Sequence, residues 1–487
     1  MNILLCSAEV TPFAKAGGLA DMAASLSKDL AKLGHNVMLI MPKYGDIDTN
    51  AFKLENTGHT IGVPMGTWME YCGLWRATLP GSKVTTYFIQ SAEYFDREGI
   101  YGNPDGFGDN DRRYIFFSRA VFEIAKVLDF SPDIIHAHDY HTALTMPFLK
   151  IHYKSDPHFF KTAGVYTIHN MAFHGMFEPQ QNMFLCGFGE FFNGSWFEYQ
   201  GAMNFMKAGI LFADKITTVS PTYAQEIRFT SAGEGLQSEL NQRGPDVIGV
   251  LNGVDYSEWN PERDKLLPIT YSKMYLGGKK ENKRRYLAEH GVHEGELMQD
   301  LPMLGIVARL TDQKGIDLLE KTIEGFIQNG IIRFTMLGTG SKQYESYFQY
   351  LAAKYSTRSF VHIGYNNTIS HRLIASCDFL LVPSKFEPCG LTQLYALKYG
   401  TIPIVRHTGG LADTIQEYDP ASGKGNGIVF HQYSPEDFAG AIRRAVLLYN
   451  TQPHWNQIIQ NAFGCDYSAK KCAERYTEVY AWALEKI

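Results

Sequence analysis

The fold of the N-terminal part is decided by residues 3–41, ILLCSAEVTPFAKAGGLADMAASLSKDLAKLGHNVMLIM. They contain an apolar segment, a glycine-rich loop, a stretch with apolar residues three and four positions apart, and a second apolar segment. The two apolar segments predict strands at Ile3–Ala8 and Val37–Met41, and the periodic stretch predicts an amphipathic helix at Leu19–Leu33. A strand, a helix and a strand in this order form a βαβ unit, which indicates a parallel sheet.

The same alternation continues along the chain and then begins again. Strands alternate with helical stretches such as Arg113–Leu128, and a second series starts after a polar, lysine-rich segment at 279–285. Because 487 residues are too many for one hydrophobic core, we expect two domains of roughly 200 to 250 residues. The other predicted strands are Thr86–Gln90, Ile134–His136, Val165–Ile168, Ile216–Val219, Leu304–Ala308, Arg333–Leu337, Phe360–Ile363, Phe379–Val382, Ile402–Val405 and Ile428–Phe430.

These elements predict an α/β fold with two Rossmann-like, doubly wound, mostly parallel sheets. The predicted domains are 1–250 and 251–465, and an amphipathic stretch at Ser468–Glu485 predicts a helix within the remaining segment, 466–487. In such sheets ligands bind at the carboxyl ends of the strands, so the loops there are the places to search for function.

Composition excludes several classes of protein. A net charge of −6 and a pI near 6.2 argue against a general nucleic-acid binder, which would present a basic face. Seven cysteines without a Cys-x-x-Cys pair fit neither a disulfide framework nor a zinc site. We therefore expect the protein to reside in the reducing cytosol. The chain opens on a strand rather than on a basic segment with an apolar core, and no apolar run approaches the ~20 residues of a membrane span.

The segment KFEPCGLTQ, residues 385–393, is typical of a ligand-binding turn. It follows an apolar run at Phe379–Ser384 and precedes a helical stretch at Leu394–Tyr399. The first N–H groups of a helix suit phosphate, and the carboxylate of Glu387 suits sugar hydroxyls, as a sugar nucleotide requires. The carboxylate fits three roles, nucleophile, electrostatic stabiliser or simple helix-end charge, but the loop offers no second carboxylate at glycosidase spacing.

This segment resembles the donor-site loop of glycogen and starch synthases, and further motifs extend the resemblance from residue 9 to residue 413. Lys15-Ala16-Gly17-Gly18-Leu19-Ala20-Asp21 is similar to that family's Lys-x-Gly-Gly-Leu loop, and His407-Thr408-Gly409-Gly410-Leu411-Ala412-Asp413 to its C-terminal copy. The motifs between them are His136-Ala137-His138-Asp139, Ile168-His169-Asn170, Leu251-Asn252-Gly253-Val254-Asp255 and Arg309-Leu310-Thr311-Asp312-Gln313-Lys314-Gly315.

The resemblance implies two Rossmann-like domains that face an interdomain cleft, the GT-B type, with the helix of 466–487 packed back on the first domain. It implies a glycosyltransferase that moves glucose from ADP-glucose to the non-reducing 4-hydroxyl of an α-1,4-glucan, glycogen or starch-like, with retention of configuration. No cofactor, metal, nucleic acid or membrane is expected as a partner. The expected compartment is the cytoplasm, or the plastid stroma for a mature plant-type chain.

The resemblance also assigns roles to residues. The Arg and Lys of the family's Arg-x-x-x-x-Lys-Gly motif hold the donor diphosphate, which implies this role for Arg309 and Lys314, although the two residues also fit a solvated loop with a surface ion pair. Glu387 is implied to hold a hydroxyl of the donor sugar, and His169 to lie against its ring. The other implied donor-binding residues are Lys15, Gly17, Gly18, Asp21, Asn252, Tyr365 as the nucleobase-stacking ring, Cys389, Gly390, Leu391, Thr392, Gly409 and Gly410.

Three histidines and Asp139 within residues 136–141 invite a metal interpretation. Side chains at a strand end point in different directions, and the resembling family uses no metal, so we assign Asp139 to the sugar or acceptor side instead. Tyr101 is expected to line the acceptor groove.

Two other functions remain open for this sequence. One is a non-hydrolysing sugar-nucleotide epimerase, which would need a proton-abstracting base at the sugar. The other is a catalytically silent glucan-binding homologue, against which the intact donor residues Lys15, Arg309, Lys314 and Glu387 argue. Release of ADP from ADP-glucose in the presence of glycogen distinguishes the three functions.

Overall fold

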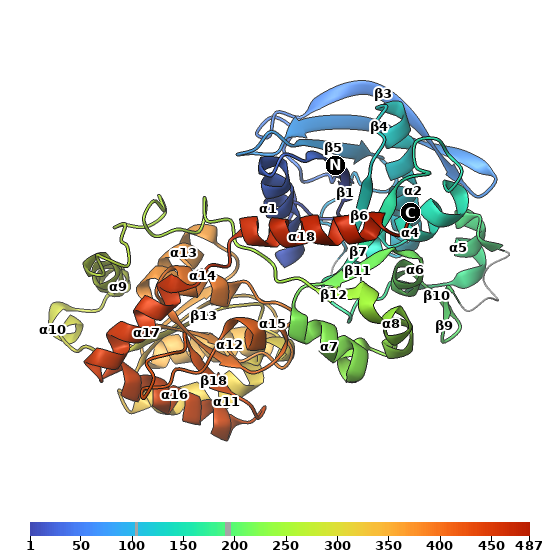
Figure 1. Cartoon of the computed structure of the whole chain (residues 1–487). Coiled ribbons are helices and arrows are strands. Elements are labelled where there is room, and N and C mark those ends of the chain that lie inside the picture. Colours follow the sequence, from blue (N-terminus) through green and yellow to red (C-terminus); the bar gives the residue numbers. More distant parts are fainter. Residues whose placement is uncertain (103–105, 190–195) are drawn as a thin grey trace. The chain divides into compact units, whose positions relative to one another are not determined.

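The computed structural model describes residues 1–102, 106–189 and 196–487 (Figure 1). The chain divides into two compact units, which are described one at a time. Unit 1 contains Met1–Gly253 and Ala469–Ile487, and unit 2 contains Val254–Ser468.

Unit 1 is built on a nine-stranded sheet in the order β12-β11-β7-β6-β1-β2-β5-β4-β3. All neighbours from β12 to β5 are parallel, and the hairpin of β3 and β4 adds two antiparallel strands at one edge. The strands are β1 (Asn2–Cys6), β2 (Asn36–Pro42), β3 (Glu55–Met65), β4 (Trp68–Thr78), β5 (Thr85–Gln90), β6 (Ile134–His138), β7 (Ala163–Ile168), β11 (Lys215–Thr218) and β12 (Val247–Gly249). A small antiparallel sheet, β8-β10-β9, contains β8 (Met176–Phe177), β9 (Glu198–Tyr199) and β10 (Ala202–Asn204).

Several helices of unit 1 pack against this sheet, among them α1, α7 and α18, whereas α5 and α8 pack mainly on other helices. In α1, buried leucine, methionine and alanine side chains recur at helical spacing, which is the pattern that the sequence predicts. The helices are α1 (Gly18–Lys32), α2 (Asn110–Val127), α3 (Asp139–Thr142), α4 (Thr145–Pro147), α5 (Pro179–Cys186), α6 (Phe205–Phe212), α7 (Pro221–Phe229), α8 (Gln237–Arg243) and α18 (Ala469–Leu484).

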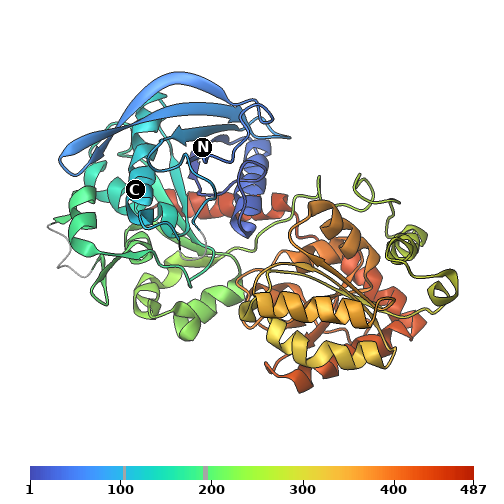
Figure 2. The ribbon, with the colours of Figure 1, turned by 180° about the vertical axis from the view of Figure 1, so that it is seen from behind.

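The C-terminal helix α18 lies across unit 1, against α1 and the strands β7 and β11, as both views show (Figures 1 and 2). Its Tyr480 hydroxyl pairs with His136 Nδ1 at 2.8 Å in the middle of the sheet. Tyr476 and Tyr480 are fully buried. Helix α18 therefore completes the core of unit 1, although it comes after unit 2 in the sequence.

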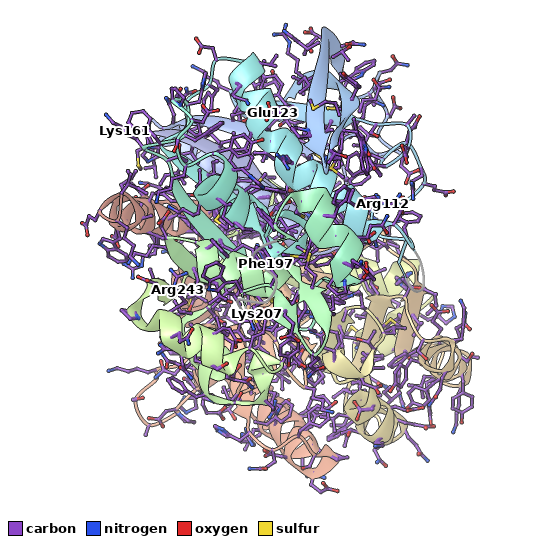
Figure 3. All side chains as sticks on the ribbon, turned by 90° about the vertical axis from the view of Figure 1, so that its right-hand side faces the viewer. Arg112, Glu123, Lys161, Phe197, Lys207 and Arg243 are labelled. Carbon is purple, nitrogen blue, oxygen red and sulfur yellow. The ribbon has the colours of Figure 1, made fainter. Side chains whose placement is uncertain are left out.

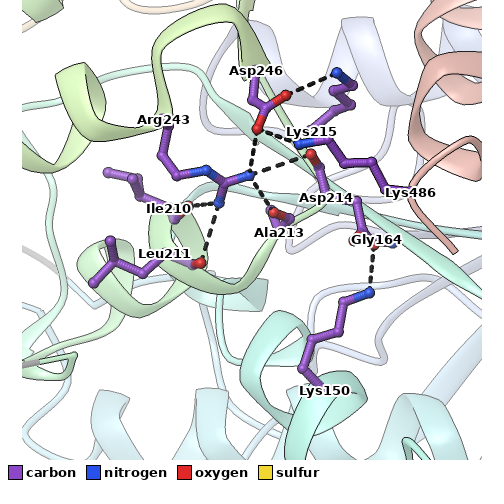
Figure 4. Close-up of polar contacts among 10 residues, drawn as sticks. All are labelled: Lys150, Gly164, Ile210, Leu211, Ala213, Asp214, Lys215, Arg243, Asp246 and Lys486. Carbon is purple, nitrogen blue, oxygen red and sulfur yellow. Dashed lines mark hydrogen bonds and ion pairs between the residues drawn. The ribbon is translucent and has the colours of Figure 1, made fainter. Parts of the chain in front are cut away.

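A cluster of charged residues around Asp246 fixes the end of the chain to unit 1 (Figure 4). The Asp246 carboxylate accepts hydrogen bonds from Lys215 (2.8 Å), Arg243 (3.3 Å) and Lys486. Arg243 also donates to backbone carbonyls at the end of α6, so it stabilises the C-terminus of that helix. Figure 3 labels Arg243 and Lys207, which come from α8 and α6, and Lys207 forms a 3.0 Å ion pair with a glutamate of α8.

Unit 2 contains a six-stranded parallel sheet in the order β15-β14-β13-β16-β17-β18. The strands are β13 (Met303–Val307), β14 (Arg333–Gly338), β15 (Ser359–Ile363), β16 (Phe379–Val382), β17 (Ile402–Arg406) and β18 (Ile428–Phe430). The helices are α9 (Gly277–Glu289), α10 (Glu294–Leu297), α11 (Ile316–Gln328), α12 (Lys342–Lys354), α13 (Asn367–Ser376), α14 (Thr392–Lys398), α15 (Gly409–Thr414), α16 (Pro435–Tyr449) and α17 (Gln452–Gly464).

The lysine-rich segment before the second sheet is helix α9, which belongs to unit 2. Lys279 is buried and donates to Thr401 Oγ1 (2.6 Å), and Lys283 forms a 2.6 Å ion pair with Asp378 at the start of β16. These lysines attach α9 to the sheet. Among the described residues, no helix is both long and apolar enough to cross a membrane.

Candidate active site

The turn Lys15–Leu19 joins β1 to α1 at the carboxyl edge of the unit 1 sheet. Lys15 Nζ forms a 2.8 Å ion pair with Asp21, and Thr11 Oγ1 donates to the same carboxylate at 2.8 Å. The backbone of Gly17 is extended (φ −152°), and a Cβ added there would meet no atom of the described residues within 4 Å. The fold therefore does not require a glycine at this position, and the open space permits close approach of a ligand.

Glu9 occupies the backbone N–H groups of this turn, which the sequence analysis did not foresee. Its Oε2 accepts from Ala16 N (2.6 Å) and Gly17 N (2.8 Å), and its Oε1 accepts from the Tyr101 hydroxyl. The residue is only 3% exposed. The sequence signal was present, because Glu9 lies just beyond a buried strand and before the glycine turn. Two N–H groups of the expected anion cradle thus already bind an anion of the chain itself.

A second group lies where β6 and β7 end. His138 Nδ1 and His169 Nε2 are 3.0 Å apart, and Asp139 accepts a hydrogen bond from the backbone N–H of His169 at 2.7 Å. Burial lowers the pKa of His169 to about 3 and raises the pKa of Asp139 to about 7. Neutral imidazoles beside a carboxyl group that is readily protonated are suited to hydrogen bonds with sugar hydroxyls.

Of the histidines at 136–141, His136 is held by hydrogen bonds within unit 1, whereas His138 Nε2 and His141 Nδ1 have no hydrogen-bond partner among the described residues. Both ring nitrogens of His136 have partners, Tyr480 at 2.8 Å and Thr167 at 2.6 Å. Across the described parts of the chain, no three His, Cys, Asp or Glu side chains are grouped so that they could hold a metal ion.

Tyr101 and Asn252 are held in different ways. The Tyr101 ring stacks on His141, with ring centroids 4.6 Å apart and planes 23° from parallel. Asn252 lies at the end of unit 1, is 5% exposed, and its Oδ1 has no hydrogen-bond partner among the described residues. A buried amide oxygen without a partner is suited to a hydroxyl of a ligand.

In unit 2, the centre of the predicted site is an ion pair. Lys314 Nζ lies 2.6 Å from Glu387 Oε2, and Ser384 Oγ donates to the same oxygen at 2.8 Å. Glu387 is 6% exposed. The two loops are also tied by their backbones, since Lys385 N donates to Gln313 O at 2.8 Å. The carboxyl ends of the neighbouring strands β13 and β16 thereby bring a cation and a carboxylate to one place.

The second glycine turn packs directly on the Glu387 loop. Gly410 N lies 3.1 Å from both Glu387 O and Pro388 O. Gly409 has a φ of 45°, and a Cβ there would lie 2.0 Å from Glu387 O. A Cβ at Gly410 would lie 2.3 Å from Cys389 O. The fold therefore requires both glycines, which support the loop from beneath.

The remaining predicted residues of unit 2 surround this pair. Cys389, Gly390 and Leu391 lead into α14, which begins at Thr392, and the side-chain amide of Gln393 donates to the carbonyls of Cys389 and Gly390 at 3.0 Å each. Arg309 is exposed at the end of β13, and Tyr365 is 70% exposed just beyond β15. The structure thus groups Lys314, Glu387 and the glycine turn closely, and leaves Arg309 and Tyr365 at the surface.

Comparisons with known proteins show similarity along the whole chain. Residues 2–242 match the family model of the starch synthase catalytic domain, and residues 293–463 match that of glycosyl transferases group 1. The glycogen synthase of Pseudothermotoga lettingae is 39% identical over 100% of this chain and 99% of its own length, and that of Bacillus cereus strain Q1 is 40% identical over 100% of both chains. The chain belongs to the glycogen and starch synthase family.

A solved structure agrees with this assignment. The catalytic domain of starch synthase IV from Arabidopsis thaliana, bound to ADP and acarbose, has a TM-score of 0.91 and 31% identity, and the match covers 99% of both chains. The predicted fold class, α/β with two Rossmann-like sheets of the GT-B type, is confirmed, and the chain is a glycosyltransferase. The roles of the individual site residues stay predictions.

Proposed function

We propose that this enzyme transfers glucose from ADP-glucose to the 4-hydroxyl at the non-reducing end of an α-1,4-glucan, with retention of configuration. The observation that carries the proposal is the Lys314–Glu387 ion pair, 2.6 Å long and largely buried, in a chain that matches glycogen synthases over its full length. A silent glucan-binding protein would not need a buried cation and carboxylate at a strand end, where they cost desolvation energy.

In this proposal unit 2 holds the nucleotide sugar. Lys314 and Arg309 bind the diphosphate and stabilise the negative charge that grows on ADP as it leaves. Glu387, already fixed by Lys314 and Ser384, accepts a hydrogen bond from a glucose hydroxyl rather than attacking the sugar. The departing phosphate assists attack on the same face of the ring. The turn from Cys389 to Thr392 borders the sugar, and the exposed ring of Tyr365 stacks on adenine.

Unit 1 contributes the remaining contacts. Lys15 adds a third cation for the donor phosphate, with Asp21 to orient it, and Gly17 and Gly18 leave room for the ligand. Neutral His169 donates to or accepts from the donor sugar, and Asp139 and Asn252 bind sugar hydroxyls. Tyr101 lines the acceptor groove. A cytoplasmic location stays a prediction.

The test is an assay of two products in one reaction. The purified enzyme is incubated with labelled ADP-glucose and glycogen, and both released ADP and label in the glucan are measured, with UDP-glucose as a second donor. We expect equal amounts of ADP and incorporated glucose. Digestion from the non-reducing ends by an exo-acting α-1,4-glucanase should release the label. ADP without incorporated glucose would indicate a hydrolase, and neither product would contradict the proposal.

A matched pair of lysine variants ties the activity to the site. Lys354 also forms an ion pair in unit 2, at 2.9 Å with Glu324, but on the surface. Lys354→Ala should keep wild-type activity, whereas Lys314→Ala should lose most of it. Because Lys15, Arg309 and Lys314 can together offset a diphosphate's charge, activity should also survive EDTA. Loss in EDTA that added Mg²⁺ restores would contradict this role of the three cations.

A further inference from the structure

Glu9 is a buried acid to which the proposed reaction assigns no role. Its carboxylate is bonded to the Lys15 turn through Ala16 N and Gly17 N, and to the Tyr101 hydroxyl, which is 92 residues away in the sequence. Building on the proposed function, we propose that Glu9 is a positioning residue that fixes the donor-side turn and the acceptor-side ring to each other. One carboxylate would then set where both substrates bind.

On the donor side, Glu9 determines which groups of the turn are available to a phosphate. The first N–H groups of a helix have no partner within the helix and attract anions. The N–H groups of Ala16 and Gly17 lie just before α1, which begins at Gly18, and one oxygen of Glu9 accepts from both, at 2.6 and 2.8 Å. A donor phosphate therefore meets the Lys15 ammonium and not these amides. Asp21 pairs with the Lys15 ammonium at 2.8 Å and so orients it before the donor arrives.

On the acceptor side, Glu9 determines how Tyr101 can bind a sugar. The phenol has one proton, and it is donated to Glu9. Toward a glucan hydroxyl the phenolic oxygen can therefore act only as an acceptor. Burial, with the negative charge of Glu9, raises the pKa of Tyr101 well above its usual range, so this proton stays in place at any working pH. Stacking on His141 at 4.6 Å fixes the plane of the ring.

Glu178 shows that a helix start alone does not need this arrangement. At the start of α5, Glu178 accepts from Gln180 N and Gln181 N, each at 2.8 Å, with its side chain exposed to solvent. Glu9 likewise accepts hydrogen bonds from two backbone N–H groups, but it is only 3% exposed. It also accepts a third hydrogen bond, from the hydroxyl of the distant Tyr101. The burial and the third bond are what a simple helix cap lacks, and they point to positioning.

The experiment measures kcat and both KM values in Glu9→Gln, Glu9→Ala, Tyr101→Phe and the double variant Glu9→Gln/Tyr101→Phe. Glu9→Ala leaves two N–H groups and a phenol without a partner, so we expect kcat/KM to fall about tenfold for the donor, no more than in Lys15→Ala, and about 10- to 100-fold for the acceptor. In Glu9→Gln the amide oxygen still accepts from the turn, so donor kinetics should stay within a few-fold of wild type while the acceptor KM rises. Glu178→Gln is the control and should change neither kcat nor KM.

The double variant separates positioning from simple structural support. If Glu9 acts on the acceptor through Tyr101, the acceptor KM of the double variant should equal that of the worse single variant, because the two changes break the same bond. Effects that simply multiply would overturn the proposal. So would Glu9 variants with a lower Tm but wild-type kcat and KM, a result that Glu9→Gln can give even if Glu9→Ala fails to fold. An inactive wild type would instead contradict the proposed function.

Discussion

The chain contains the sequence Gly-Gly-Leu-Ala-Asp twice, at residues 17–21 and 409–413, and the two copies are held by opposite kinds of group. In the first turn, a buried carboxylate accepts from the backbone N–H groups, and a Cβ at Gly17 would meet no atom within 4 Å in the part of the chain that the structure describes. In the second turn, backbone carbonyls lie against the glycines, and a Cβ at Gly410 would lie 2.3 Å from Cys389 O. The same residues therefore lack close packing partners among the described residues in unit 1 and support a loop in unit 2.

A shared motif therefore does not imply a shared role. Gly409 and Gly410 pack on the loop that carries Glu387, so under the proposed function they would act on the ligand only through that loop. No such packing is seen at Gly17 among the described residues, so we predict that it leaves room for a ligand. Variants of the two turns should consequently affect different measurements.

Substitution of the lysine near each turn should change kcat/KM for the donor more than any other substitution considered. Lys314→Ala should lower kcat/KM for the donor on the order of 100- to 1,000-fold, since it removes a fixed cation at the growing charge. Lys314→Arg should restore activity only in part, because a planar fork does not reproduce a compact ammonium. Lys15→Ala should lose only about tenfold, because an exposed cation is screened by water. Steady-state kinetics gives kcat/KM for the donor in all three variants. Equal losses in Lys15→Ala and Lys314→Ala would contradict the different roles predicted for the two lysines.

Alanine substitution of one glycine in each turn should separate an effect on stability from an effect on donor binding. Gly410→Ala should lower the free energy of unfolding by about 3 kcal/mol or more, because the new methyl group meets backbone rather than a flexible side chain. Gly17→Ala should leave Tm within a few degrees of wild type and raise the donor KM. Thermal unfolding with donor kinetics on both variants tests this. A Gly410→Ala variant as stable as wild type would show that this turn does not support the Glu387 loop. A destabilised Gly17→Ala variant would show that the fold requires a glycine in the first turn.

The parts predictable from the sequence were those set by local patterns. Hydrophobic periodicity gave every predicted strand to within about two residues of its observed ends, and the motif order led to the family. The β3–β4 hairpin was missed because its outer face is largely exposed and its register breaks between Asn56 and Thr60, which hides the alternation. The lysine-rich segment was not predicted to be a helix, because Lys279 and Lys283 bury charges whose partners lie about 100 residues away or more.

The candidate site shows the same limit. Lys314 and Glu387 could be named from their motifs, but their 2.6 Å ion pair joins residues 73 apart and depends on strand order. Glu9 could not be assigned to Tyr101 by any local rule, since the segment that carries Tyr101 meets β1 only in the folded unit. Which side chains meet across a parallel sheet depends on the order of its strands. Motifs in the sequence can therefore identify a functional side chain but not its partner.

Two partly buried acidic residues of unit 1, Asp139 and Asp246, should make stability depend on pH in opposite ways. Burial raises the pKa of Asp139 to about 7, so ionisation of this group opposes folding. Its neutral form is fully compatible with the fold below about pH 4, and the wild type loses stability relative to Asp139→Asn as the pH rises from about 4 to about 7. At pH 8, Asp139→Asn should be the more stable protein by about 2 to 4 kcal/mol, yet less active if Asp139 binds sugar hydroxyls. Denaturant unfolding from pH 4 to pH 8 tests the sign, and a constant difference would contradict it.

Asp246 should show the opposite pH dependence, with the smallest effect. Burial alone would raise its pKa, but the hydrogen bonds and charges of Lys215 and Lys486 lower it to about 2. A carboxylate with a lowered pKa stabilises the fold above the unfolded pKa near 4, and this contribution disappears as the pH falls to about 2. Asp246→Asn should therefore lower the unfolding free energy by about 1 to 2 kcal/mol at pH 7 and by much less at pH 2.5.

The reason for this effect is the attachment of α18, because Lys486 follows that helix and reaches Asp246 beside β12. Lys486→Ala should remove part of the same stability, and adding it to Asp246→Asn should have little further effect, since both break one contact. Asp129→Asn is the control, because the Asp129 side chain is 97% exposed, and it should change stability by less than about 0.5 kcal/mol at either pH. A loss in Asp246→Asn that is the same at pH 7 and pH 2.5 would mean that packing, and not the charge of Asp246, holds the C-terminal helix on unit 1.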